Sequence, residues 1–482
     1  MKKFLKILFI IIIIAILAAV GIFIYEYYFY DDYIYDYGEY YDDEYYDDEE
    51  YMDEGGSFLS NLFGRDDEYT DEYDDYAKED YSDEDIPEHV QLDSLSQLTV
   101  LINFRDQKLK TTESDWDEFY FGKSGSVAAY FDEMSKGKFE IVPAKETYGE
   151  KNNGIIIITL DRKHPNLTPE SSDREYDVCS DIFVEMLDAV DEYIDFSAYD
   201  KNGDGDVLSN ELSITMIAAG YEANEYSMDE NQMAGIWISE DYFTEADGVY
   251  LAEYIICGEL DMDENGKSQI VTVGIACHET AHVLGLPDLY DIDYSSIGLG
   301  FHALMSEGNN NRIPGERLGS TPSPMMAWSR IYAGFIEPQV VKASGTYTLY
   351  GQSTDKYNVI KISDGKGYYL IENVDFNKYG AGIIEYMNHS GIAIWYIDDS
   401  VMTEENIWYN EVMNDDRHRG ITLIEATGND DLMEESLDYD NPDYDHYFAK
   451  GYVDEYVTDN GTVIHVLSEP GTEMKIEITF GN

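Results

Sequence analysis

The chain has 482 residues, enough for two or three domains, and carries 100 acidic against 30 basic residues, a formal net charge of -70. Such a charge repels a phosphate backbone, which excludes nucleic acid as a partner and favours metal cations. The three cysteines, Cys179, Cys257 and Cys277, are too few for a disulfide framework.

The amino terminus has the pattern of a membrane-directed segment. Lysines occupy three of the first six positions, and an unbroken apolar run of 18 residues extends from Ile7 to Ile24. A helix of that length spans about 27 Å, close to the thickness of a bilayer core. Because the lysines precede the run, we expect residues 1–25 to be a transmembrane helix that anchors an extracellular protein. A cleaved signal segment, which would leave a secreted protein, is the alternative.

Residues 26–94 form an acidic, tyrosine-rich segment. Between Glu26 and Glu88 it holds 27 Asp or Glu against two basic residues. Self-repulsion predicts an extended, disordered tether. The simplest interpretation is a solvated linker between the membrane and the folded body. The alternative is a propeptide whose carboxylates occupy a metal site until it is removed.

Strands alternate with helices between residues 95 and 337. Apolar, β-branched runs predict buried strands, and apolar residues at helical spacing predict helices. The predicted strands are Leu98–Phe104, Lys138–Val142, Gly154–Leu160, Leu212–Ala219 and Ala234–Ser239, and the predicted helices are Ser124–Ser135 and Asp173–Asp191. This order predicts an α/β (α+β) domain.

Residues 200–211 match the twelve-residue calcium loop, with oxygen-bearing side chains at positions 1, 3 and 5, glycine at position 6 and glutamate at position 12. The expected calcium ligands are Asp200, Asn202, Asp204, Asp206 through its backbone carbonyl, and Glu211. Since a strand follows, we expect an isolated loop with a structural role. An acidic turn without an ion is the alternative.

The stretch GIACHETAHVLGLPDLYD, residues 274–291, contains the motif His-Glu-x-x-His at His278, Glu279 and His282. On a helix, residues i and i+4 share a face, so both imidazoles can bind one zinc ion while Glu279 reaches a water on the metal. Cys277, directly before the motif, is expected to be a small buried packing residue.

A third zinc ligand is expected shortly after the helix. Gly285 can adopt the left-handed conformation that ends a helix and turns the chain back. Asp288 is then the favoured ligand, and Asp291 is the alternative because either carboxylate could point inward.

After residue 337 the sequence changes to short strand-like runs divided by Gly, Asp and Asn. The runs are YNVIKIS, GYYLIE, GIAIWYID, GITLIEA, TVIHVLS and MKIEITF. This pattern predicts a β-sandwich-like domain over residues 338–482.

The zinc motif, followed by FHALMSEG (301–308) and PSPMMAWSRIYAGF (322–335), resembles the immune-inhibitor-A-like secreted metallopeptidases of bacteria, which share the metzincin-type zinc motif. The run Leu304-Met305-Ser306 is similar to the Met-turn beneath the zinc in that clan, which implies a structural role for Met305. The resemblance covers about residues 95–482 and implies a metzincin-like catalytic domain at 95–337.

These features predict a zinc- and calcium-binding endopeptidase that cleaves extracellular proteins or peptides. Zinc would lower the pKa of a bound water, and Glu279 would take its proton as general base and pass it to the leaving amine. The alternative is a catalytically inactive cell-surface binding protein that keeps zinc and calcium for structure. Amide or ester hydrolysis on a non-protein substrate is a third possibility.

Overall fold

A computed structural model describes residues 89–481, apart from 168–171, 223–231, 234–243, 263–266, 293–295, 416–417 and 434–443. The predicted anchor, most of the acidic segment and the strand predicted at Ala234–Ser239 lie outside the described residues. No helix within the described part of the chain is long and apolar enough to cross a bilayer.

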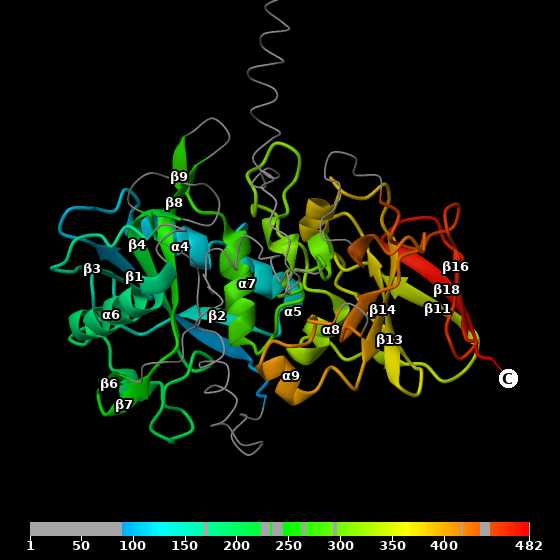
Figure 1. The fold of residues 1–482 in the computed structure, drawn as a ribbon, viewed down its shortest axis with the longest axis horizontal. Helices are drawn as coiled ribbons and strands as arrows, with labels where there is room; N and C mark the ends of the chain where they lie inside the picture. Colours follow the sequence, from blue (N-terminus) through cyan, green and yellow to red (C-terminus); the bar gives the residue numbers. More distant parts are fainter. Residues whose placement is uncertain are drawn as a thin grey trace, which may run out of the picture. The chain divides into compact units, whose positions relative to one another are not determined.

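The first half of the described chain forms a mostly parallel sheet (Figure 1). Its strands are β1 (Ser94–Asn103), β2 (Glu140–Pro143), β3 (Ile155–Thr159), β4 (Ser213–Glu222), β5 (Gln232–Met233), β8 (Ile255–Met262) and β9 (Ser268–Ile270). Strand β1 pairs in parallel with β2 and β3 along one side and with β4 along the other, β4 pairs in parallel with β5 and β8, and β9 is antiparallel to β8. The four predicted strands that fall on described residues are confirmed.

Strand β8 was not predicted, although it is almost entirely buried. Its apolar run is interrupted by Gly258 and by Glu259, which has no exposed surface. The Glu259 carboxylate is satisfied by the backbone N–H groups of Lys110 and Thr111 and by the Thr111 hydroxyl. A charged residue in a buried strand breaks the apolar pattern on which the sequence reading depends.

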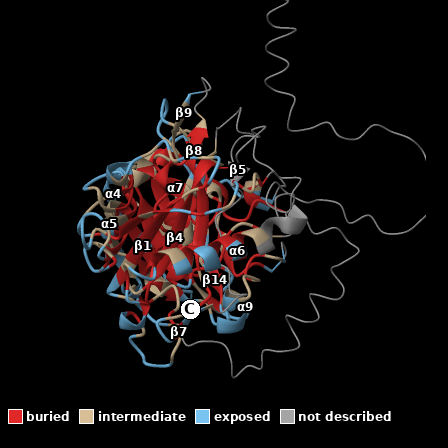
Figure 2. Ribbon diagram, turned by 90° about the vertical axis from the view of Figure 1, so that its left-hand side faces the viewer, coloured by how far each residue is buried: buried red, intermediate tan, exposed pale blue. Residues whose placement is uncertain are grey.

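Helices cover both faces of this sheet. Alternate residues of β1 belong to two different clusters of buried side chains: Leu101 packs with α4 (Glu113–Phe121), α5 (Val127–Ser135) and α7 (Val273–Val283), while Val100 and Ile102 pack with α6 (Ser172–Val190). This alternation follows from the two-residue period of a strand. Figure 2 shows the buried residues gathered on β1, β4, β8 and α7.

The helix predicted at Ser124–Ser135 begins at Val127, because the Ser126 hydroxyl accepts the N–H of Ala129 and caps it. The helix predicted at Asp173–Asp191 is α6. Helix α4 was missed, although Thr112 and Asp115 form a capping box at its start.

The C-terminal part forms two sheets. The first contains β10 (Gln339–Val340), β12 (Ile360–Ser363), β13 (Gly367–Val374), β14 (Gly391–Asp398) and β15 (Ile421–Leu423); the second contains β11 (Gly345–Tyr350), β18 (Glu473–Thr479), β17 (Val463–Val466) and β16 (Glu455–Val457). All their pairings are antiparallel except β10 with β12. Each of the six predicted strand-like runs overlaps one of these strands: β12, β13, β14, β15, β17 or β18. Side chains of both sheets share one buried cluster, as expected of packed sheets. Strands β6 (Thr244–Ala246) and β7 (Val249–Leu251) form a separate hairpin.

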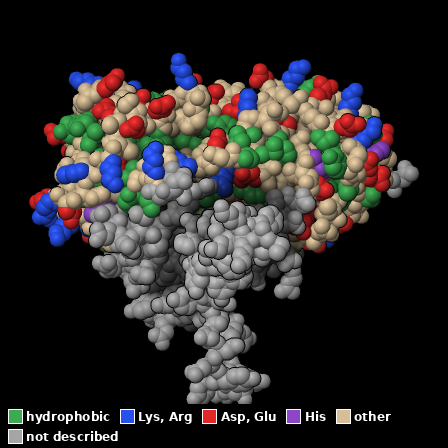
Figure 3. Space-filling view, turned by 90° about the horizontal axis from the view of Figure 1, so that it is seen from above, with side chains coloured by type: hydrophobic (Ala, Val, Ile, Leu, Met, Phe, Trp, Pro, Cys, Tyr) green, Lys and Arg blue, Asp and Glu red, His purple; other side chains and the backbone are tan. Residues whose placement is uncertain are grey.

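A single hydrophobic cluster crosses the boundary predicted at residue 337. It includes Leu101 of β1, Cys277 of α7 and Trp328 of α8 (Ala327–Tyr332), together with Leu370 of β13 and Trp395 of β14. The zinc motif therefore lies on a helix whose surrounding core draws on both parts of the chain. On the face drawn in Figure 3, acidic side chains of the described residues are interspersed with Lys and Arg.

Candidate metal centre

Helix α7 carries the His-Glu-x-x-His motif and begins in close contact with a loop. The N–H of Gly274 donates to the carbonyl of Gly319 at 2.9 Å. A Cβ atom on Gly274 would lie 1.9 Å from the carbonyl oxygen of Asn309, so a larger residue would push the helix away from this loop. The glycine thus allows the start of the helix to lie directly against this loop.

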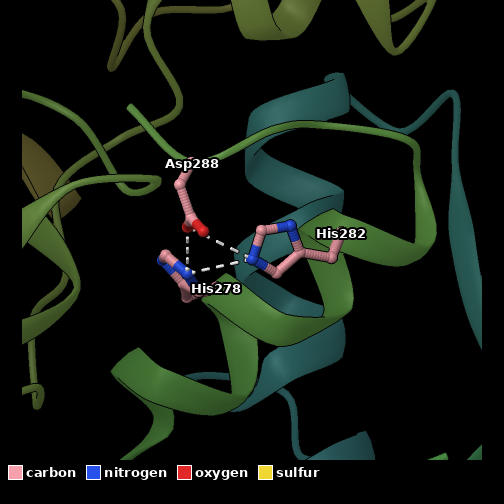
Figure 4. Close-up of side chains that lie close together, drawn as sticks. All are labelled: His278, His282 and Asp288. Carbon is pink, nitrogen blue, oxygen red and sulfur yellow. Dashed lines mark hydrogen bonds and ion pairs between the residues drawn. The ribbon is translucent and has the colours of Figure 1, made fainter. Parts of the chain in front are cut away.

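The structure brings His278, His282 and Asp288 together (Figure 4). The two Nε2 atoms are 3.2 Å apart, and Asp288 Oδ1 lies 3.0 Å from Nε2 of His278 and 3.3 Å from Nε2 of His282. The rings are nearly perpendicular, with an interplanar angle of 82°. Two imidazole nitrogens and one carboxylate oxygen therefore converge on one point.

The turn after α7 delivers Asp288 to the histidines. Gly285 has φ +77, and its N–H donates to the carbonyl of His282 while the N–H of Leu286 donates to the carbonyl of Ala281. These two bonds are those of the Schellman motif, which ends a helix with a left-handed glycine. The chain then reverses direction, and Asp288 enters the site from the loop, as the sequence predicted.

The backbone determines the tautomer of both imidazoles. His278 Nδ1 lies 3.0 Å from the carbonyl of Leu304, and His282 Nδ1 lies 2.7 Å from the carbonyl of Leu286. A carbonyl can only accept, so both Nδ1 atoms carry hydrogen, and each imidazole in its neutral form directs the Nε2 lone pair into the site. Fixing a ligand histidine through its second nitrogen is the usual arrangement in metal sites.

Asp288, the acidic residue of the group, is buried, and one of its carboxylate oxygens has no hydrogen-bond donor among the described residues. Oδ1 of Asp288 accepts no hydrogen bond from any described residue with the histidines in these tautomers, and the side chain is 8% exposed. Burial opposes its charge, but the two adjacent imidazoles outweigh burial and hold the Asp288 pKa well below its usual range. Burial would likewise lower the pKa of His282, but the Asp288 carboxylate raises it to about 9. The site thus attracts positive charge.

Glu279 lies next to this group. Its Oε1 is 4.0 Å from Nε2 of His278, and its side chain is 13% exposed. Burial raises the pKa of the Glu279 carboxyl, and the two histidines oppose that rise only in part. A carboxylate with a raised pKa beside a metal-ligand set is suited to accepting a proton near neutral pH.

The sequence that carries this site matches a known protein family. Residues 107–335 match the family immune inhibitor A peptidase M6, catalytic domain. This segment belongs to the M6 peptidase family. The chain is therefore a metallopeptidase, an enzyme that hydrolyses peptide bonds. The comparison with curated proteins found no match.

The other residues predicted for the M6 site occupy distinct places. Asp291 has no exposed surface and accepts a hydrogen bond from the Ser296 hydroxyl at 2.9 Å, outside the group formed with Asp288. Met305 is buried, and its carbonyl accepts the N–H of Leu289 at 2.6 Å. The Met305 segment thereby holds the loop directly after Asp288.

The backbone of the calcium loop is held by its own side chains. The N–H groups of Gly203 and Gly205 donate to the two carboxylate oxygens of Asp200, and the N–H of Lys201 donates to Oε1 of Glu211. Among the described residues, two clusters of three side chains bring candidate metal-ligand atoms within 4.8 Å of one another. The carboxylates of the calcium loop do not form such a cluster. Oε2 of Glu211 is buried and has no hydrogen-bond partner among the described residues.

The second of those groups consists of Glu425, Asp431 and His446. Nε2 of His446 lies 3.0 Å from Asp431, its Nδ1 lies 2.8 Å from Nε2 of His302, and Nδ1 of His302 lies 2.6 Å from the Tyr447 hydroxyl. Burial holds the pKa of His302 well below its usual value. Both ring nitrogens of His302 and of His446 thus have a hydrogen-bond partner.

Three groups that orient the site residues were not predicted from the sequence. The carbonyls of Leu286 and Leu304 orient the imidazoles, and any residue could supply a carbonyl, so no side-chain pattern marks them. The third is Asn410, which hydrogen-bonds Asp288 from beyond the M6 segment. The three cysteines are all buried.

Proposed function

We propose that the chain is a zinc-dependent endopeptidase for extracellular proteins or peptides, with His278, His282 and Asp288 as zinc ligands and Glu279 as general base. The observation that carries the proposal is the pair of Nε2 lone pairs directed at a buried Asp288 oxygen that accepts no hydrogen bond within the described part of the chain. Such a set is costly unless a cation or a proton lies between its members.

The donor set fits zinc better than a hard cation. Tetrahedral zinc with bonds of 2.0 to 2.1 Å places neighbouring ligand atoms roughly 3.3 Å apart. The three distances between donor atoms here are 3.0, 3.2 and 3.3 Å. Two imidazoles and one carboxylate are also the protein ligands of an open catalytic zinc site, whereas calcium and magnesium prefer oxygen alone.

Zinc held there would polarise the peptide carbonyl and make a bound water more acidic. The carboxylate of Glu279 then removes a proton from the attacking water and transfers it to the leaving amine. Its raised pKa makes both transfers feasible in one cycle. The carbonyls of Leu286 and Leu304 keep the imidazoles fixed throughout, because both Nδ1 protons stay bonded to them.

The test uses the full-length chain with bound metal quantified by elemental analysis. We expect about one zinc per chain at the triad and cleavage of casein that a chelator abolishes and zinc restores. Glu279→Gln keeps the shape and the zinc, but should lose activity by on the order of 100- to 10,000-fold, the usual contribution of a general base. Glu118→Gln, on the exposed side of α4, is the matched control and should retain activity.

A different result would favour one of the other functions. If the wild-type chain binds zinc but neither casein nor a peptide library is cleaved, and Glu279→Gln behaves identically, the protein keeps the metal for structure and binding. Zinc-dependent cleavage of simple esters or amides with an uncut peptide library would point to a non-protein substrate.

We further propose a structural calcium ion in the loop at residues 200–211, bound by Asp200, Asn202, Asp204, the Asp206 carbonyl and Glu211. The supporting observation is Oε2 of Glu211 at the last loop position, which is buried and has no hydrogen-bond partner among the residues that the structure describes. Calcium should raise the melting temperature of the full-length chain, magnesium should do so much less, and Glu211→Gln should remove the difference. An equal response of wild type and variant to calcium would reject the site.

An extracellular location of the catalytic part, behind an anchor or cleaved signal at residues 1–25, is proposed from the apolar run of the sequence. Protease treatment of intact cells should digest the catalytic part, or the culture medium should contain it. Its recovery intact inside treated cells would reject this location.

A further inference from the structure

Asn410 makes two hydrogen bonds to the residue proposed as third zinc ligand. The backbone N–H of Asp288 donates to Asn410 Oδ1 at 2.6 Å, and Asn410 Nδ2 donates to Asp288 Oδ2 at 2.7 Å. The backbone N–H can only donate and the carboxylate can only accept, so the orientation of the amide is fixed. One side chain thus holds both the main chain and the carboxylate of Asp288.

Because of these bonds, the two oxygens of the Asp288 carboxylate have different roles. Oδ2 is occupied by Asn410, while Oδ1 lies 3.0 and 3.3 Å from the two Nε2 atoms and accepts no hydrogen bond from the described residues. Rotation of the carboxylate about its own axis would break the bond from Nδ2. Asn410 therefore keeps one oxygen free and directed at the point between the imidazoles.

The local backbone explains why asparagine stands at this position. Asn410 follows the short helix α9 (Glu404–Trp408) and has φ +59, a left-handed conformation that asparagine tolerates better than most residues. Its N–H donates to the carbonyl of Ile407 at 3.3 Å. Aspartate could also adopt this conformation, but it has no donor for Oδ2 of Asp288.

We infer that Asn410 is a positioning residue of the metal centre, supplied by the C-terminal β-rich part and acting through Asp288. The inference rests on the proposed zinc site and adds to it a partner beyond the matched segment, which ends at residue 335. Side chains that orient metal ligands commonly contribute 10- to 100-fold to metal affinity or activity.

The test is zinc affinity of the full-length chain, measured by competition with a chromophoric chelator. Asn410→Gly removes the amide and suits the left-handed backbone, so it separates the loss of the hydrogen bonds from backbone strain. We expect affinity to fall by about 10- to 100-fold and the visible spectrum of the cobalt-substituted protein to change. Asn152→Gly is the matched control: Asn152 also has a positive φ, 63, and is exposed in the turn before β3, and its replacement should change neither quantity.

A double-mutant cycle separates positioning from a general effect on folding. In an Asp288→Ala background, Asn410→Gly should cause no further loss of zinc affinity, because its target is gone. Wild-type affinity and an unchanged cobalt spectrum in Asn410→Gly, in a chain that binds zinc and cleaves casein, would overturn this inference alone. A wild-type chain that binds no zinc would overturn the proposed function together with it.

Discussion

Glu372 joins the end of the M6 segment to the C-terminal sheet, and its replacement should unfold both together. This glutamate of β13 is 1% exposed. Its Oε1 accepts the N–H of Ala327 at the start of α8 at 2.9 Å and the indole N–H of Trp395 at 2.8 Å, while Oε2 accepts the Tyr357 hydroxyl at 2.5 Å. Glu372→Leu leaves three buried donors without an acceptor.

The expected cost follows from those three donors. A buried polar group that loses its partner costs about 1–3 kcal/mol, so Glu372→Leu should destabilise the protein by about 3–9 kcal/mol. That is a large part of the 5–15 kcal/mol typical of a folded domain. Glu372→Gln should cost less, because its amide oxygen can still accept both N–H groups. Glu477→Leu, at an exposed position of β18, is the control and should stay within about 0.5 kcal/mol of wild type.

Urea unfolding of the full-length chain would measure these changes with two probes, tryptophan fluorescence and peptidase activity. Trp328 lies on α8 and Trp395 on β14, so fluorescence reports both sides of the contact. We expect both probes to shift to lower urea together in Glu372→Leu. A wild-type midpoint in this variant, or separate transitions for the two probes, would refute the reasoning that these parts unfold as one.

Three further predictions concern the turn, a buried histidine and a thiol. Gly285→Ala forces a side chain into φ +77 at about 1–2 kcal/mol and should weaken zinc binding, whereas Gly125→Ala, at φ +65 with open space around it, should lower the melting temperature alone. Burial lowers the pKa of His164 to about 4, so between pH 6.5 and 4 the unfolded chain holds a proton that the folded chain lacks. The free energy of unfolding should therefore fall by about 3 kcal/mol over that range from this residue, and His164→Phe should show a shallower acid slope in urea midpoints. Burial raises the pKa of the Cys277 thiol well above its usual value, so a maleimide should label it only after unfolding; rapid labelling of the native protein would contradict its burial.

Much of the metal centre was predictable because its parts lie close together in sequence. The helical spacing of His278 and His282 and the left-handed turn at Gly285 place Asp288 within reach by local geometry alone. The same reasoning favoured Asp288 but left Asp291 open as the alternative. What separates them is tertiary: Asp288 is held by Asn410, whereas Asp291 accepts a bond from Ser296.

Strands with a continuous or alternating apolar pattern were predicted from the sequence. Strand β8 was missed because buried residues that are not apolar interrupt its pattern. Strand β18 was predicted because its buried positions, Met474, Ile476 and Ile478, are all apolar. Strands β13 and β14 were predicted because each begins with a run of mainly apolar and aromatic residues, although β13 also buries Glu372. Strand β8 carries Glu259, and nothing near it in sequence reveals that Lys110 and Thr111 will satisfy the charge. Partners more than a hundred residues apart are a property of the fold, and local pattern does not encode them.

The boundary predicted at residue 337 marks a change of secondary structure, but buried and partly buried polar contacts cross it, and three of them matter most here. Asn410 holds Asp288, Glu372 accepts the N–H of Ala327, and His446 pairs with His302 three residues before Met305. A chain cut after residue 337 would lose all three partners and leave buried donors unsatisfied beside the zinc motif. The C-terminal β-rich part therefore completes the catalytic core, and substitutions there can reach the metal centre through contacts that a comparison limited to the M6 segment does not include.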